Sequence, residues 1–146
     1  VELNDKQNTV IDMGCGYWPI GIYIGKAYPD KHVYLFDVNE RAVAMALKNQ
    51  VENAVENTNI SVSNLFDQVN VKADVILTNP PIRAGKQTVF KLYEEAYLNL
   101  NDGGILYVVI QKKQGAPSSV NHLSITFGNC EVIEKKKGYW ILSARK

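Results

Sequence analysis

The feature that most constrains the fold is a regular alternation of apolar runs of strand length with segments of helical spacing. Five of the runs are mostly continuous and β-branched, which is typical of strands covered on both faces. Strand, helix and strand in repetition predict an α/β fold with a Rossmann-like, doubly wound parallel sheet. The five runs are residues 9–14, 32–38, 60–65, 73–78 and 104–111.

Three segments between or after these runs have helical spacing. Asn39 can cap the first helix, the second ends near residues 102–104, and a shorter third helix around residues 119–127 is stopped by Gly128. The residues expected to face the core are Val43, Leu47, Gln50 and Ala54 in the first helix, and Val89, Leu92, Tyr93, Ala96 and Leu100 in the second.

The C-terminal segment departs from the alternation. Residues 130–145 contain two strand-like runs that are separated only by residues 135–138. This connection is too short for a crossover between parallel strands, so the runs are expected to form an antiparallel hairpin at the edge of the sheet.

Length and composition exclude several classes of protein. The 146 residues, 46% of them hydrophobic, suffice for a single domain with a real core. No apolar run approaches the roughly 18 residues of a membrane span, and residues 1–8 lack a signal-peptide core. Cys15 and Cys130 lie far apart, and His32 and His122 lack metal-binding partners in the sequence. We expect a cytoplasmic protein without a metal site.

Charge is distributed unevenly along the chain. Residues 1–80 carry six basic and ten acidic side chains, a net charge of −4, whereas residues 81–146 carry ten basic and five acidic ones, a net charge of +5. The overall charge of +1 hides this difference. Such a chain suits a cationic ligand in one region and a polyanion in another.

Ligands of doubly wound sheets bind at the carboxyl ends of the parallel strands. After the first run, Gly14 and Gly16 allow a tight turn that a nucleotide can approach closely, and Pro19 suits the first turn of a helix. The glycines could instead serve the turn alone. The dinucleotide fingerprint requires a third glycine where Pro19 stands, which disfavours a nicotinamide oxidoreductase.

Two later strand ends carry polar residues. Asp37 lies 23 positions after Gly14, near the spacing of about 20 at which an acidic residue binds ribose hydroxyls. It could instead cap a helix, but Asn39 suits that role better. Asn64 could bind an adenine edge or serve only as a turn residue.

The fourth run ends in Asn79-Pro80-Pro81. The prolines stiffen the turn and remove two backbone donors, so acceptors remain. The Asn79 side-chain oxygen and the Pro80 carbonyl can converge on a group with two N–H donors, such as an exocyclic amine. Two acceptors drawing on its hydrogens favour the pyramidal form, whose lone pair can attack. The alternative is that this tripeptide only terminates a strand.

Basic residues follow this turn and the fifth run. Arg83, Lys86, Lys112 and Lys113 are candidate contacts to nucleic-acid phosphates. Lysines also guard exposed sheet edges, and this role is favoured for residues 135–137.

With these motifs in place, the chain resembles a class I methyltransferase dependent on S-adenosylmethionine. More closely, it is similar to the small methyltransferase domain of bacterial ribosomal RNA guanine-N2 methyltransferases. The resemblance covers nearly the whole chain and depends on "VIDMGCGYWPIGI", "DVILTNPPIRAGK", "GGILYVVIQKKQGAPS" and the hairpin. It implies a seven-stranded sheet in the order 3-2-1-4-5-7-6 with strand 7 antiparallel, formed by residues 1–146 as a single domain.

The resemblance also implies roles for individual residues at each strand end. Asp12, Gly14, Cys15 and Gly16 would border the methionine part of the cofactor, Asp37 and Val38 the ribose, Asn64 and Leu65 the adenine, and Asn79, Pro80, Pro81 and Ile82 the target amine, with Asn79 also beside the cofactor.

The chain departs from the family pattern in two respects. Members of the family it resembles usually carry glycine where Trp18 stands, and they usually have a further N-terminal segment or a duplicated domain. Within the same chemistry, the amine could belong to adenine or to a protein glutamine. Sites for those targets often have an aromatic residue after the second proline, so Ile82 disfavours them. A non-catalytic module that binds cofactor or RNA is a further alternative.

Overall fold

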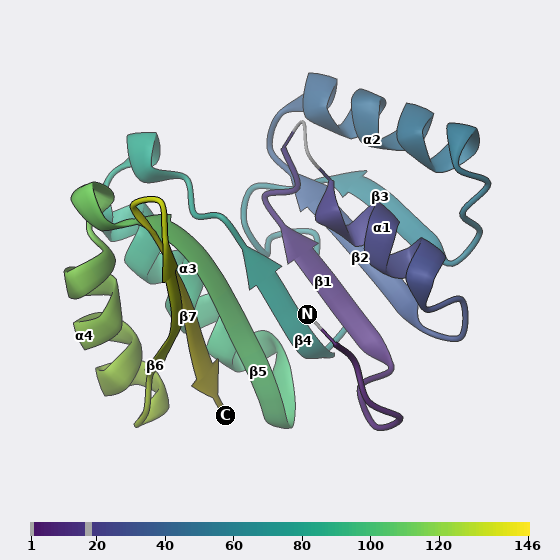
Figure 1. Ribbon diagram of the computed structural model, residues 1–146. Helices are drawn as coiled ribbons and strands as arrows, with labels where there is room; N and C mark the ends of the chain where they lie inside the picture. Colours follow the sequence, from purple (N-terminus) through teal and green to yellow (C-terminus); the bar gives the residue numbers. More distant parts are fainter. Residues whose placement is uncertain (1, 17–18) are drawn as a thin grey trace.

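Seven strands form one sheet in the order β3-β2-β1-β4-β5-β7-β6 (Figure 1). The computed structural model describes residues 2–16 and 19–146. Neighbouring strands from β3 to β5 are parallel, and β7 is antiparallel to both β5 and β6. The predicted order and the antiparallel seventh strand are confirmed. The strands are β1 (Thr9–Met13), β2 (His32–Asp37), β3 (Thr58–Val62), β4 (Ala73–Thr78), β5 (Leu100–Gln111), β6 (Glu131–Lys136) and β7 (Tyr139–Arg145).

Helices cover both faces of the sheet. Two clusters of buried side chains fill the space between helices and strands, one including Ile22 of α1 and Ala46 of α2, the other including Leu92 of α3 and Leu123 of α4. Within the described residues, no helix is long and apolar enough to cross a bilayer. The helices are α1 (Ile20–Ala27), α2 (Glu40–Glu52), α3 (Lys86–Asn99) and α4 (Ala116–Phe127), and the 3-10 turns are η1 (Ile82–Ala84) and η2 (Lys112–Gln114).

The face of α2 that packs on the sheet differs from the predicted one. Val43 is buried as expected, but Leu47 is 43% exposed, and Ala54 lies beyond the helix with a φ of +53°. The face of α2 that packs on the sheet also includes Ala42 and Ala46, which are fully buried. Small alanines let the helix approach the sheet closely, and Leu47 then lies on its flank.

Two predicted boundaries were also wrong. Helix α3 ends at Asn99, and Leu100, expected on the helix, is a fully buried first residue of β5 that pairs with Ala73. The register then shifts, so residues 101–104 form an irregularity before regular pairing resumes. Strand β3 begins at Thr58 and ends at Val62, which leaves the predicted strand residues 63–65 in a loop.

The C-terminal hairpin agrees with the prediction, with a shorter turn. Lys135 and Lys136 belong to β6, and Lys137 and Gly138 form a two-residue turn with φ values of +53° and +81°. The Lys112 amide donates to the Gly138 carbonyl at 2.8 Å. The turn therefore lies at the carboxyl end of β5, on the same edge of the sheet as the predicted ligand loops.

The remaining boundaries concern helix starts. Helix α1 begins directly after Pro19, and α4 begins at Ala116, three residues before its predicted start, and ends before Gly128 as predicted. Trp18, at which the chain departs from the family pattern, lies outside the described residues.

Candidate active site

The loops that follow β1, β2, β3 and β4 line two cavities at the carboxyl edge of the sheet. The larger, of about 440 Å³, lies between the β1 loop and the ends of β4, β5 and β7. The smaller, of about 200 Å³, lies between the loops after β2, β3 and β4. Gly14 and Asn79 line both, so the cavities adjoin. The predicted site residues are Asp12, Gly14, Cys15, Gly16, Asn79 and Pro80 in the larger cavity, and Gly14, Asp37, Val38, Asn64, Leu65, Asn79 and Pro81 in the smaller one.

The loop after β1 is tied to the end of β2 by its backbone. The amides of Gly14 and Cys15 donate to the Phe36 carbonyl at 2.8 and 3.0 Å. Gly14 and Gly16 have φ values of +74° and +57°, which side chains with a Cβ rarely adopt. An added Cβ would meet only ordinary contacts, such as the Asn79 carbonyl oxygen at 3.7 Å from Gly14. Backbone conformation, rather than lack of space, therefore requires these glycines.

Asp37 organises two loops at once. Its Oδ2 accepts the Gly16 amide at 2.8 Å, and its Oδ1 accepts the Asn39 amide at 2.8 Å. The Asn39 side chain in turn accepts the amides of Arg41 and Ala42, which confirms Asn39 as the helix cap. Because a carboxylate offers about four lone-pair positions, each Asp37 oxygen can still accept a hydroxyl of a ligand.

Asp12 is a buried carboxylate beneath the β1 loop, with only 5% of its surface exposed. Its Oδ2 accepts the Gly21 amide at 2.9 Å, in the first turn of α1. Burial, with a smaller contribution from the charge of Asp37, raises the pKa of Asp12 to about 6 despite this hydrogen bond. The sequence indicated its position but not its burial.

Cys15 contributes an apolar wall to the larger cavity. Burial, together with the charges of Asp12 and Asp37, raises the pKa of its thiol to about 12, so the thiol stays protonated at neutral pH. Across residues 2–16 and 19–146, no three His, Cys, Asp or Glu side chains gather as metal ligands would.

The Asn79-Pro80-Pro81 turn extends directly from β4. Thr78 anchors it through a 2.9 Å hydrogen bond from its hydroxyl to the Met13 carbonyl. The Asn79 side chain is exposed, while Pro80 is buried. The Ile82 amide donates to the Pro80 carbonyl at 2.9 Å, so that oxygen is partly occupied, whereas the sequence led us to expect a free acceptor. One lone pair remains on that carbonyl oxygen.

Sequence reasoning missed Ser63, which shapes the smaller cavity. This buried hydroxyl donates to the Leu65 carbonyl at 2.7 Å and accepts the Gln68 amide at 3.1 Å. The bonds hold Leu65 in the left-handed region, at a φ of +51°, which is uncommon for a side chain of this size. A serine at the end of a strand is a typical signal of such a loop.

The apolar side of the larger cavity was also missed. Its walls include Tyr107 and Val109 of β5, Ile141 of β7 and Ile20 of α1. On β5 these positions alternate with Leu106 and Val108, which pack against α3 and α4. The two strands therefore supply the wall from the face opposite α3 and α4, which strand alternation indicates only once the sheet order is known.

The predicted basic residues are all exposed on the same edge of the sheet. Arg83 lies in η1 and Lys86 begins α3, while Lys112 and Lys113 lie in η2. Arg83, Lys112 and Lys113 line neither cavity. Lys86 lines neither of these two cavities but a third one, between α3 and α4. Ile82, which was expected beside the target amine, also lines this third cavity.

Known proteins similar to this chain point to methyl transfer. A protein of Bacillus subtilis (strain 168), YbxB, which is described as uncharacterized, is 44% identical over 144 residues, covering 97% of this chain and 72% of YbxB. Ribosomal RNA large subunit methyltransferase G of Shewanella amazonensis is 30% identical over 95% of this chain. Ribosomal RNA small subunit methyltransferase C of Haemophilus ducreyi is 30% identical over 94%. This chain spans only 38% and 42% of the lengths of these two enzymes.

A solved structure shares the fold. The T. thermophilus 16S rRNA N2 methyltransferase RsmC, in complex with AdoMet and guanosine, matches with a TM-score of 0.83 at 21% identity, over 94% of this chain and 37% of that one. The family model "Methyltransferase small domain" matches residues 1–143. The chain therefore belongs to the methyltransferase small domain family, whose cofactor is S-adenosylmethionine.

Proposed function

We propose that this methyltransferase modifies the 2-amino group of guanine in ribosomal RNA. The observation that carries the proposal is the Asn79-Pro80 pair of acceptors beside the larger cavity, with Asn79 also lining the smaller one. An amine with two hydrogens is the natural complement of two converging acceptors. The names of the ribosomal RNA methyltransferases to which the chain is similar support this target.

The residues around the cavities suit S-adenosylmethionine. The unused lone pairs of Asp37 can accept ribose hydroxyls, with Val38 beside them, and Asn64 and Leu65 can flank the adenine in the smaller cavity. When bound, the cofactor supplies an electrophilic methyl group on a positively charged sulfur. The residues that would border its methionine part are Asp12, Gly14, Cys15 and Gly16.

Asn79 and Pro80 hold and activate the amine in this proposal. Their oxygens accept its two hydrogens, which favours the pyramidal nitrogen and keeps its lone pair available. The nitrogen becomes acidic only as its new bond forms, so its proton can pass to water without a strong base. Orientation of the reacting groups supplies most of the acceleration, about 7–11 kcal/mol for a well-aligned pair.

Basic residues on the rim would hold the RNA backbone. Arg83, Lys86, Lys112 and Lys113 are exposed around the turn and can neutralise phosphates. A guanine in folded RNA must leave its stack to reach Asn79. A ribosomal RNA substrate also agrees with a cytoplasmic protein.

The test is to incubate the purified protein with radiolabelled S-adenosylmethionine and separate fractions of ribosomal RNA, DNA and protein. We expect label in ribosomal RNA from a strain that lacks this protein, recovered as N2-methylguanine after digestion. Label in adenine or in protein glutamine would refute the guanine assignment. Mapping of the modified position would then identify the substrate nucleotide.

A non-catalytic role in binding cofactor or RNA is the second candidate. It is favoured by the hydrogen bond from the Ile82 amide to the Pro80 carbonyl, which leaves that oxygen less available to a target amine. Titration calorimetry separates the two. Binding of S-adenosylmethionine without methyl transfer to any RNA would favour the second role. The same role would be favoured if the folded protein bound RNA but showed no heat of binding with S-adenosylmethionine.

A further inference from the structure

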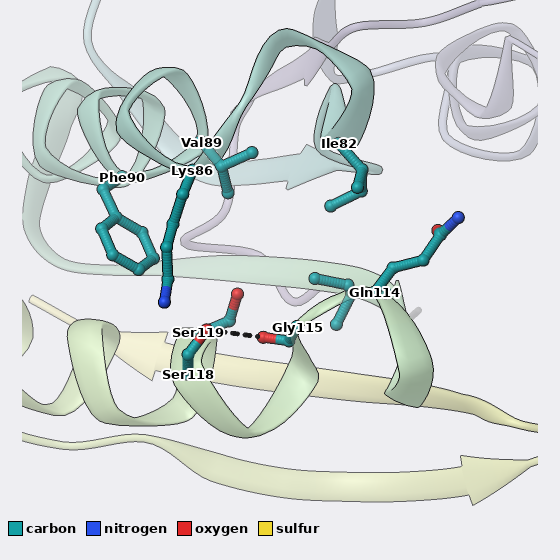
Figure 2. A pocket seen from close by; sticks show the side chains of 9 residues that line it. Ile82, Lys86, Val89, Phe90, Gln114, Gly115, Ser118 and Ser119 are labelled. Carbon is teal, nitrogen blue, oxygen red and sulfur yellow. Dashed lines mark hydrogen bonds between the residues drawn. The ribbon is translucent and has the colours of Figure 1, made fainter.

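A third cavity, of about 200 Å³, lies between the N-terminal ends of α3 and α4 (Figure 2). Val89 and Phe90 of α3 form part of its wall, and Ile82 closes the end nearest the Asn79-Pro80-Pro81 turn. Ile110 of β5 completes the apolar lining. Apart from Ile82 and Lys86, none of its lining residues has a role in the proposals above.

Polar groups surround the mouth of the cavity. The Ser118 hydroxyl donates to the Gly115 carbonyl at 3.2 Å and keeps its own acceptor positions. The exposed Gln114 forms no side-chain hydrogen bond with other described residues, so its amide offers both donors and an acceptor. The Ser119 hydroxyl is already paired with that of Tyr93 at 2.9 Å. These groups can match the polar edge of a heterocycle.

An aromatic ring and a positive charge lie together at this site. Phe90 stacks on His122 with ring centroids 4.0 Å apart and planes inclined by 4°, which fixes the ring in place. The Lys86 ammonium lies 5.7 Å from the Phe90 centroid, and Figure 2 shows its side chain reaching towards Ser118 and Ser119. A flat ring attached to an anion suits this combination of apolar slot, aromatic edge and cation.

The cavity is connected to the proposed amine site through one residue. Ile82 lines the cavity, and its amide donates to the Pro80 carbonyl at 2.9 Å. We take this link to mean that a strand presenting a base to Asn79 can place the adjacent nucleotide at the mouth of this cavity. Single-stranded bases are held mainly by apolar and aromatic contact, with their backbone on basic residues.

We propose that the cavity binds the base of the unpaired nucleotide that neighbours the target guanosine, with Lys86 at its phosphate. This inference rests on the proposed function, because it deepens the recognition of RNA at the same site. The slot does not depend on catalysis, however, so it can be tested by binding alone.

The binding test uses single-stranded RNA oligonucleotides with one central guanosine among uridines. A thiouridine replaces the uridine on one side of the guanosine or on the other, and crosslinked peptides are identified after trypsin digestion. We expect one of the two oligonucleotides to crosslink to residues 87–91 or 114–135, which include Phe90 and Ser118. Crosslinks from both that are confined to other peptides would overturn the proposal.

Two variants test the same site in solution. Ser118→Leu fills the cavity, and Gln114→Ala removes an exposed amide with little risk to folding. Because one base contact is worth roughly a tenfold change in affinity, we expect about tenfold weaker RNA binding in Ser118→Leu and a smaller loss in Gln114→Ala. A third variant, Lys86→Ala, removes the ammonium proposed to contact the phosphate and should also weaken RNA binding. Lys91→Ala, at an exposed position of α3 outside the cavity, is its matched control and should not.

An abasic residue beside the guanosine completes the design. It should weaken binding to the native protein about tenfold but leave binding to Ser118→Leu unchanged, because that slot is already filled. Equal weakening of both proteins would overturn the cavity assignment.

If native protein binds and crosslinks as expected but methylates no RNA, the proposed catalytic function fails while the base site stands. If it methylates RNA and the abasic residue has no effect, the base site fails while the catalytic function stands.

Discussion

The side-chain amide of Asn79 is exposed and, like that of Asn64, has no hydrogen-bond partner among the described residues. The surrounding structure does not require the amide. We therefore expect Asn79→Ala to fold normally, to bind S-adenosylmethionine with unchanged affinity and to lose roughly a hundredfold in kcat, on the scale of one preorganised polar contact.

Single-turnover methyl transfer and calorimetry measure the two quantities separately. Asn49→Ala, at a half-buried position of α2 that lines neither cavity, is a control that should change neither. If Asn79→Ala lost cofactor affinity as strongly as turnover, the residue would instead support the shape of the loop.

Asp12 makes a prediction about pH. Its pKa is about 6 in the folded protein and 3.8 in the reference state, so the folded protein binds this proton more tightly. The contribution of Asp12 to the free energy of unfolding is therefore highest below about pH 4, falls as pH rises through the window from 4 to 6, and stays lower above it. The shift of about two units corresponds to about 3 kcal/mol.

Asp12→Asn removes this titration while keeping an oxygen that can accept the Gly21 amide. We expect the stability of native protein relative to Asp12→Asn to fall by up to about 3 kcal/mol between pH 4 and pH 6, measured by urea unfolding at each pH. A difference that is constant across this window would show that Asp12 titrates normally.

The residues of the candidate site were predictable where a strand end fixes them. Asp37, Asn64 and Asn79 follow strands in the sequence, and parallel strands bring their carboxyl ends to one edge. The Ile82 amide on the Pro80 carbonyl was not predictable, because it depends on how the chain turns after the second proline. Ser63 acts through the backbone of Leu65, which sequence spacing alone does not indicate.

At the scale of elements, α3 and α4 meet through a buried pair of hydroxyls. Tyr93 is fully buried, and burial raises its pKa to about 12. Its hydroxyl lies 2.9 Å from that of Ser119, which is 2% exposed. Removing either partner leaves the other buried without a hydrogen bond, whereas removing both does not.

We expect Tyr93→Phe and Ser119→Ala each to lower the free energy of unfolding by about 1–3 kcal/mol, and the double variant to lose clearly less than the sum. Urea unfolding of the four proteins measures this coupling. Tyr97→Phe, at a half-buried position of the same helix, should cost little. Additive losses would mean that the two hydroxyls contribute independently.

Helix and strand bounds were predictable where apolar spacing and chain breaks agree. Strand β4 was predicted with its observed limits, since Asn79-Pro80-Pro81 ends it. The buried face of α2 was not, because alanines carry little hydrophobic signal although they allow close packing. Leu100 fits both helical spacing and a strand start, and only its pairing with Ala73 decides between them.

At the scale of the whole molecule, the sheet order turns the uneven charge of the sequence into two regions. Strands β1 to β4 come from residues 1–80, with a net charge of −4, and occupy one half of the sheet. Strands β5 to β7 come from residues 81–146, with a net charge of +5, and occupy the other (Figure 1). The proposed cofactor loops, which must accept a cationic sulfur, lie mainly in the acidic half, while the basic rim lies beside them.

This division predicts where salt-sensitive RNA binding arises. Lys112→Ala/Lys113→Ala removes two charges from η2, and Lys26→Ala/Lys48→Ala removes two exposed charges from the acidic half, so both variants change the net charge from +1 to −1. Each phosphate contact to single-stranded nucleic acid contributes about 0.7 to the slope of log affinity against log salt concentration. We expect the first variant to bind RNA more weakly and to lose up to about 1.4 from that slope, while the second keeps the native slope.

Fluorescence anisotropy with a labelled single-stranded RNA at several salt concentrations measures the affinity and the slope for each variant. Equal changes in the two variants would mean that overall charge, rather than the rim around η2, governs RNA binding.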